Sequence, residues 1–400
     1  MKRLYIFPLL FLLIGSLAGL ILRFSFLQPL PNFTYSNFLH THSHLMFLGW
    51  IFNALYLFML FHYIQDHKKQ KFNKLFVILQ FSLIGMLFSF PAQGYGLFSI
   101  IFSTLHTIGV TLFIFWFFNS VKKTPSLPIT YFKTALIFFL LSAAGPLVLG
   151  PLSAMGLSHS KGYFLALYYY LHFQYNGVFF FGIMGILLQL LQEKNIPLNQ
   201  NTFRTAHPIF VIICILTYSL STLWAEPGGP FILLGFLSGS LQLVLGFIVV
   251  TQLVKLKSQW KKFKPVSRVL LITTALSFLA KIILQALSAI PSISLLAYEV
   301  RPYIIAYLHL VLLGVISPVL FIWYVEKDMI NAPWSSSSIF FYLLGWLGME
   351  VLLIAPPLHI FPFLLPYMSG GLFLFSGFIT VATLLFLLGI HAGKKSQTPL

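Results

Sequence analysis

The chain has 400 residues, of which 58% are hydrophobic, 18% aromatic and only 8% charged. Soluble domains carry about 25% charged residues, so the composition excludes a soluble protein and indicates an all-α polytopic membrane protein embedded in a lipid bilayer. The formal net charge of +17 is spread over short segments between apolar runs. This is the pattern of the positive-inside rule, and we expect no nucleic acid partner.

Apolar runs bounded by charges, Pro and Gly predict twelve membrane-spanning helices that form one domain, residues 1–400. The first run is too long for a signal peptide and is expected to be retained. The predicted spans are 4–27, 39–64, 74–92, 95–119, 130–155, 161–191, 203–224, 230–254, 267–290, 301–325, 338–357 and 365–391.

Basic residues orient these spans. With both termini in the cytoplasm, twenty of the 24 Lys and Arg residues fall on the cytoplasmic side, three fall on the opposite side, and Lys281 falls inside the ninth span. The twenty are Lys2, Arg3, Lys68, Lys69, Lys71, Lys74, Lys122, Lys123, Lys133, Lys194, Arg204, Lys255, Lys257, Lys261, Lys262, Lys264, Arg268, Lys327, Lys394 and Lys395, and the three are Arg23, Lys161 and Arg301. A miscounted span would mix the two sets.

Three alternating histidines, His40, His42 and His44, stand at the outer end of the second span. Polar groups in hydrocarbon are costly unless they find partners, so histidines here suggest a function. His40 and His44 are four residues apart and share a helix face, whereas His42 points away from it.

The pattern His, four residues, Gly occurs at His44–Gly49, His172–Gly177 and His309–Gly314, at intervals of 128 and 137 residues. Each copy lies in an even-numbered predicted span, four spans apart, which favours three pseudo-symmetric groups of four helices. The glycine, about one turn further along, would either let a flat group approach the helix or allow close helix packing.

This layout resembles the catalytic subunit of the heme-copper oxidase and nitric oxide reductase superfamily, and it is similar to the NnrS family of heme- and copper-containing membrane proteins. The segments that carry the resemblance are Leu39-His40-Thr41 with Gly49, Leu171-His172 with Gly177, and Ala306-Tyr307-Leu308-His309-Leu310 with Gly314. The superfamily's paired histidines on helix 7 are absent, and Tyr307 stands where helix 10 carries a further histidine.

The resemblance implies a heme, most simply of b type, ligated by His309 together with His40 or His44. The superfamily's spacing favours His40, and the internal repeat favours His44. Arg23 and Arg301 are candidates to bind the heme propionates, or else they are interfacial anchors.

Other residues are candidate metal ligands, each with a plainer alternative. His172 is expected to bind copper or a second heme, or to belong to a polar network between helices. His106 is a third-ligand candidate or a structural histidine, and Tyr307 is a phenolate ligand or a packed tyrosine. His42 is kept among the metal candidates although no role is derived for it.

The ionisable pair Lys281 and Glu350 is expected to form an ion pair or to act in proton transfer. The sequence thus predicts a heme-binding, or heme- and copper-binding, protein of the bacterial inner membrane. Its function would be electron transfer, or binding or detoxification of a diatomic gas such as NO or O2. The alternatives are a proton- or metal-coupled secondary transporter and a non-catalytic assembly or sensor relative of an oxidase subunit.

Overall fold

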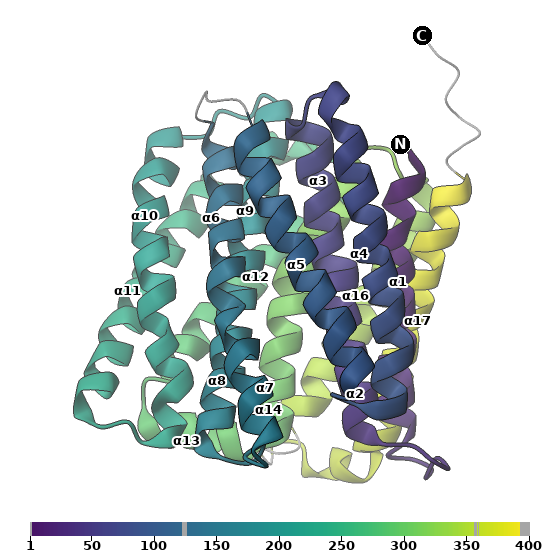
Figure 1. Ribbon diagram of the computed structural model, residues 1–400. Coiled ribbons are helices and arrows are strands. Elements are labelled where there is room, and N and C mark those ends of the chain that lie inside the picture. The colour runs from purple at the N-terminus through teal and green to yellow at the C-terminus, as the bar shows by residue number, and fades with distance from the viewer. Residues whose placement is uncertain (1, 122–125, 356–357, 359, 393–400) are drawn as a thin grey trace. The chain divides into compact units, whose positions relative to one another are not determined.

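The computed structural model describes residues 2–121, 126–355, 358 and 360–392, and in these residues every regular element is helical (Figure 1). The α-helices are α1 (Ile6–Phe24), α2 (Tyr35–His44), α3 (Asn53–Tyr63), α4 (Asp66–Gln93), α5 (Leu97–Ser120), α6 (Leu127–Ser142), α7 (Ala144–Ala154), α8 (Lys161–His172), α9 (Phe180–Glu193), α10 (Gln200–Leu216), α11 (Gly229–Lys255), α12 (Pro265–Leu287), α13 (Pro291–Glu299), α14 (Arg301–His309), α15 (Ser317–Glu326), α16 (Ala332–Ile354) and α17 (Met368–Ala392). The predicted all-α class is confirmed.

Twelve helical segments are long and apolar enough to cross a membrane, as predicted. They are Ile6–Phe24, Tyr35–Tyr63, Asp66–Gln93, Leu97–Ser120, Leu127–Ala154, Lys161–Glu193, Gln200–Ala225, Gly229–Lys255, Pro265–Leu287, Arg301–Glu326, Ala332–Ile354 and Pro362–Ile390. The largest difference from prediction is the third span, which begins at Asp66 instead of residue 74 because its basic first turns are also helical. Side chains such as Phe88 and Leu147 are 72% and 76% exposed, as expected of a surface that faces lipid.

The chain divides into two compact units. Unit 1 consists of Met1–Lys123 with Tyr324–Leu400, and unit 2 consists of Thr124–Trp323. In unit 1 the second span is 89% buried over its most apolar window, against 33–50% for the first, third and fourth spans. In unit 2 the sixth span is 94% buried and the fifth only 33%. The histidine-bearing span is therefore the central helix of each unit.

In three places an α-helix changes to a π-helix directly after a histidine. The π segments are η2 (Leu45–Phe52), η3 (Phe173–Phe179) and η6 (Leu310–Ile316), and they follow His44, His172 and His309. The π-helix is rare and is frequent at functional sites. All three copies of the His-x4-Gly pattern thus share a backbone irregularity at the same position.

Two of the repeat's glycines lie against a phenylalanine of the preceding span. A Cβ on Gly49 would stand 2.7 Å from Phe11 of α1, and a Cβ on Gly177 would stand 2.6 Å from Phe138 of α6. Of the two roles predicted for these glycines, the structure supports close helix packing, because a phenylalanine ring already occupies the space beside each.

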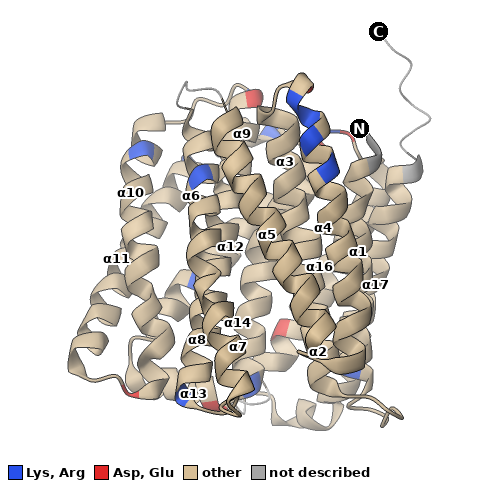
Figure 2. Ribbon diagram, in the orientation of Figure 1, with Lys and Arg blue, Asp and Glu red and all other residues tan. Residues whose placement is uncertain are grey.

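Charged side chains gather at helix ends (Figure 2). In unit 1 the group Lys68, Lys69, Lys71 and Lys74 lies at the start of α4, where Lys69 pairs with Asp66 at 2.9 Å. Arg23 lies in the last turn of α1. Lys122, Lys123, Lys394 and Lys395 lie outside the described residues.

Candidate functional site

In unit 1, His44 has the geometry of a metal-ligating histidine. Its Nδ1 lies 2.9 Å from the backbone carbonyl oxygen of His40, one turn earlier on the same helix. A carbonyl only accepts hydrogen bonds, so Nδ1 carries the proton and the lone pair of the neutral ring is on Nε2. Such a backbone bond at one nitrogen fixes the tautomer and orients the other nitrogen toward a ligand.

Aromatic side chains surround His44 and His40 on the shared face. The ring centroid of His44 lies 4.4 Å from that of Phe90, and the centroid of His40 lies 4.5 Å from that of Tyr95. The predicted sharing of a face by His40 and His44 is therefore seen in the structure. An apolar wall of this kind limits water access to the imidazoles.

His42 points elsewhere, as predicted. Its Nδ1 lies 2.8 Å from the carbonyl oxygen of Gly15, and its ring packs over Gly19 of the same helix, α1. This bond joins α2 to α1 and gives His42 a structural role, while its metal-ligand role stays a prediction.

His106 of α5 is the least satisfied imidazole of unit 1. It is 1% exposed, and neither ring nitrogen has a hydrogen-bond partner among the described residues. Its ring lies edge-on to Phe52 at 6.2 Å, and it is close enough to His44 for an electrostatic interaction. A buried imidazole without hydrogen bonds is costly, so the third-ligand interpretation of His106 stays a prediction.

In unit 2, His172 occupies the corresponding position before a π segment but uses both of its nitrogens. Its Nε2 donates to the carbonyl oxygen of Cys214 at 2.8 Å. Its Nδ1 accepts from the amide of Asn176 at 3.2 Å and from the hydroxyl of Ser221 at 3.3 Å. A copper ion at His172 would have to displace one of these bonds, so the geometry supports the alternative, a polar network between helices.

The remaining site candidates lie as follows. His309 ends α14 in unit 2, so its predicted pairing with His40 or His44 joins residues of different units and stays a prediction. The hydroxyl of Tyr307 is buried with no hydrogen-bond partner among the described residues. Arg23 is half-buried near His42 and Tyr35, whereas Arg301 is exposed at the first residue of α14.

The described residues contain no group of three or more His, Cys, Asp or Glu side chains that could hold a metal ion. A heme needs only one or two protein ligands, because the porphyrin supplies the other four nitrogen ligands, and the Nε2 of His44 has a lone pair to offer. The nitrogens of His172 are already bonded within the protein. Both expected cofactors, heme and copper, stay predictions.

Lys281 and Glu350 each have a hydrogen-bond partner on their own helix. The Nζ of Lys281 donates to Oε1 of Gln285 at 2.7 Å, and Oε1 of Glu350 accepts from the indole of Trp346 at 3.1 Å. Neither bond joins Lys281 to Glu350. The two residues belong to different units, so their expected pairing stays a prediction. Sequence reasoning missed Gln285 and Trp346, although the four-residue spacing of each pair was a usable signal.

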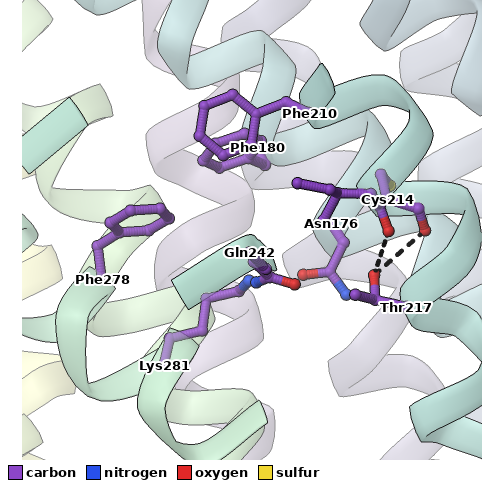
Figure 3. Close-up of a pocket in the computed structure, with 9 residues that line it drawn as sticks. Asn176, Phe180, Phe210, Cys214, Thr217, Gln242, Phe278 and Lys281 are labelled. Atoms are coloured by element: carbon purple, nitrogen blue, oxygen red, sulfur yellow. Dashed lines mark hydrogen bonds between the residues drawn. The ribbon is translucent and has the colours of Figure 1, made fainter. Parts of the chain in front are cut away.

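Unit 2 also contains a small polar cavity that the sequence did not predict (Figure 3). Its volume is about 20 Å³, and its lining consists of Asn176, Phe180, Phe210, Ile213, Cys214, Thr217, Gln242, Phe278 and Lys281. The lining comes from η3, α9, α10, η4 (Thr217–Ala225), α11 and α12, so no single stretch of sequence contains the site.

The chain matches no family model and no curated protein. The candidate function therefore rests on the contacts of the side chains described above.

Proposed function

We propose that this protein is a heme-binding membrane protein in which His44 is an axial ligand of a b-type heme. The observation that carries the proposal is the π segment that begins directly after His44, since such irregularities are frequent at functional sites. The hydrogen bond from His44 Nδ1 to the His40 carbonyl adds weight, because it leaves the lone pair on Nε2. That bond alone does not mark a ligand, because His62 makes the same kind of bond.

Each residue of this site has a defined task. His44 supplies the lone pair, the His40 carbonyl keeps the ring in one tautomer and orientation, and Phe90 packs against the imidazole and limits water access. When bound, the heme itself supplies reversible one-electron chemistry and an affinity for NO or O2. The function that follows is electron transfer, or binding or detoxification of a diatomic gas.

The proposal also covers the organisation of the chain. In it, the protein lies in the inner membrane of a bacterium, both termini are in the cytoplasm, and the spans form three pseudo-symmetric groups of four. Support for the groups comes from the π segments after His44, His172 and His309, and from the matching Gly49–Phe11 and Gly177–Phe138 contacts.

The test is the optical spectrum of the full chain purified from heme-replete cells, oxidised and then reduced with dithionite. We expect a Soret band and a sharp reduced α band. Both are lost in His44→Ala and kept in His62→Ala. His62 is a matched control because it lies on the same span and its Nδ1 makes the same kind of bond, 2.9 Å to the carbonyl of Phe58. Folded protein without heme absorbance would refute the proposal.

A secondary transporter is the second candidate, favoured by the buried amine of Lys281 and the polar cavity beside it. Intramembrane ionisable groups commonly mark substrate or proton pathways. If the well-folded protein contains no heme, transport becomes the favoured function. Transport assays in proteoliposomes with the native chain and with Lys281→Met would test it.

A further inference from the structure

The polar cavity of unit 2 is organised by the tautomer of His172. The Nε2 of His172 must carry the proton, because its partner is the carbonyl oxygen of Cys214. The Nδ1 of the neutral ring is then an acceptor, and it takes its hydrogen bond from the amide nitrogen of Asn176. This fixes which way the Asn176 amide faces.

The oxygen of Asn176 consequently faces away from His172. Figure 3 shows it turned toward the side of the cavity where Lys281 and Gln242 lie. Asn176 is only 6% exposed, and its Oδ1 has no hydrogen-bond partner among the described residues. The cavity therefore contains a buried acceptor that lacks a donor, which is costly in a membrane interior.

Lys281 supplies the opposite kind of group to the same cavity. Its side chain is 4% exposed and makes one hydrogen bond, to Gln285, whose Oε1 also accepts from Gln242 at 2.7 Å. No carboxylate in the described part of unit 2 pairs with it. The described acidic residues of unit 2, Glu193, Glu226 and Glu299, lie at or beyond helix ends. A protonated Lys281 would be a buried charge without a counter-ion from its own unit, which is strongly unfavourable.

A second, apolar cavity adjoins the first. It has a volume of about 50 Å³, is lined by side chains such as Met184, Leu253 and Trp260, and shares Phe180 and Phe278 with the polar cavity. The rings of Phe180 and Phe278 are stacked, with centroids 5.6 Å apart and an interplanar angle of 11°. Its mainly apolar lining favours neutral molecules over ions, because an ion would lose its hydration there.

We propose that the polar cavity binds a small weak acid, HA, of up to about three non-hydrogen atoms, which reaches it as the neutral molecule. A water-sized guest needs ~10–15 Å³, so the volume of about 20 Å³ holds one or two non-hydrogen atoms beside Asn176 and Lys281. A third atom of the guest must extend toward the adjoining apolar cavity. Neutral HA donates its hydrogen to Oδ1 of Asn176 or to the amine of Lys281.

Transfer of the proton to Lys281 converts R–NH2 and HA into R–NH3⁺ and A⁻, so that no charge is created overall. The anion then supplies the counter-charge that the described residues of unit 2 do not provide. This site is independent of the proposed heme site, because every residue it uses belongs to unit 2.

Azide is a suitable probe, because hydrazoic acid has three nitrogen atoms and the bound ion has a strong infrared stretch. The full chain in nanodiscs is reduced with dithionite, so that any heme is ferrous and does not take azide, and is titrated at pH 6. We expect a shifted, saturable azide band of one equivalent per chain. Lys281→Met should remove it, whereas Lys255→Met, at the end of α11, should leave it unchanged.

A second pair of variants keeps the test independent of any folding defect in Lys281→Met. Cys214→Leu fills the cavity while keeping the backbone carbonyl that binds His172, and should weaken azide binding at least tenfold. Cys214→Ser keeps the space and should bind within threefold of native. No bound band in the native protein, a band that survives Lys281→Met, or equal binding by the two Cys214 variants would overturn the proposal.

Discussion

The two units place a histidine at the same point of their central helix, yet they bond it in opposite ways. His44 of unit 1 gives one nitrogen to a carbonyl of its own helix, so Nε2 is directed outward. His172 of unit 2 bonds through both nitrogens to Cys214, Asn176 and Ser221. A repeated motif thus carries a candidate ligand in one unit and a structural hub in the other. The difference lies in the partners: His172 bonds to Asn176 of its own span and to Cys214 and Ser221 of the next span, whereas among the described residues His44 bonds only to a carbonyl of its own helix.

The most direct test of this comparison is the heme content of the protein after each of the two histidines is removed. We predict that His44→Ala lowers heme content at least tenfold, because an axial ligand is removed. His172→Ala should keep more than half of the heme, since its nitrogens are occupied by protein. Pyridine hemochrome quantification per mole of folded chain measures both. The reverse ranking would assign the ligand to unit 2 and make the bonds of His172 secondary.

The free energy of unfolding should rank the two variants in the opposite order, with the larger loss in His172→Ala. His172→Ala leaves the amide of Asn176 and the hydroxyl of Ser221 without a buried partner, which should cost about 2–4 kcal/mol. His44→Ala in the heme-free protein loses one bond to a carbonyl at a partly exposed position and should cost about 0.5–1.5 kcal/mol. Chemical denaturation in micelles, followed by circular dichroism, gives the two values. Equal costs would mean that the network around His172 contributes little.

Much of this fold could be predicted from sequence, for a physical reason. Twelve spans follow from apolar length alone, since hydrocarbon thickness fixes how many residues a helix needs. The shared face of His40 and His44 follows from helical period. These are local properties, and the structure bears them out to within a few residues at most ends.

The bonding of individual side chains could not be predicted in the same way. The change from α- to π-helix after His44 depends on which backbone groups pair, and the apolar pattern is the same for both. The bond from Lys281 to Gln285 on its own helix was not predicted, and the expected pairing of Lys281 with Glu350 of the other unit stays a prediction. The cavity beside it draws on six elements, so its residues are adjacent only in the folded chain.

Glycine substitutions test a feature that the two units share, the close packing at Gly49 and Gly177. Gly49→Ala and Gly177→Ala place a Cβ within 3 Å of Phe11 and Phe138, and each should destabilise its unit by about 1–3 kcal/mol through overpacking. The measurement is the shift of the denaturation midpoint relative to native.

Each glycine has a control in its own unit. Gly377 of α17 and Gly150 of α7 have no atom within 4 Å of an added Cβ, so Gly377→Ala and Gly150→Ala should leave stability unchanged or raise it slightly. If all four variants shifted the denaturation midpoint equally, the effect would be one of helix propensity. The packing of Phe11 on Gly49 and of Phe138 on Gly177 would then contribute nothing to stability.

The smallest expected effect concerns one buried polar pair in each unit, Asn53 with Gln80 next to η2 and Gln174 with Ser142 at η3. In unit 1, Asn53 and Gln80 bond reciprocally, at 2.8 Å and 3.3 Å, so both amides are satisfied by each other. In unit 2, Gln174 donates to Ser142 at 2.9 Å, and its own oxygen has no partner among the described residues. Coupling energies of polar pairs in membranes average about 0.6 kcal/mol and reach about 1.7.

We therefore expect a double-mutant cycle with Asn53→Leu and Gln80→Leu to give a coupling near the upper value, and one with Gln174→Leu and Ser142→Ala to give about half of it. In the first cycle Gln80→Leu leaves the Asn53 amide unpaired, and Asn53→Leu leaves the Gln80 oxygen unpaired while Gln80 Nε2 keeps its bond to the Phe76 carbonyl. In the second cycle Gln174 already has an oxygen without a partner among the described residues before any change. Equal couplings would show that a reciprocal pair gains nothing over a single bond here. The difference between the units would then be confined to their histidines.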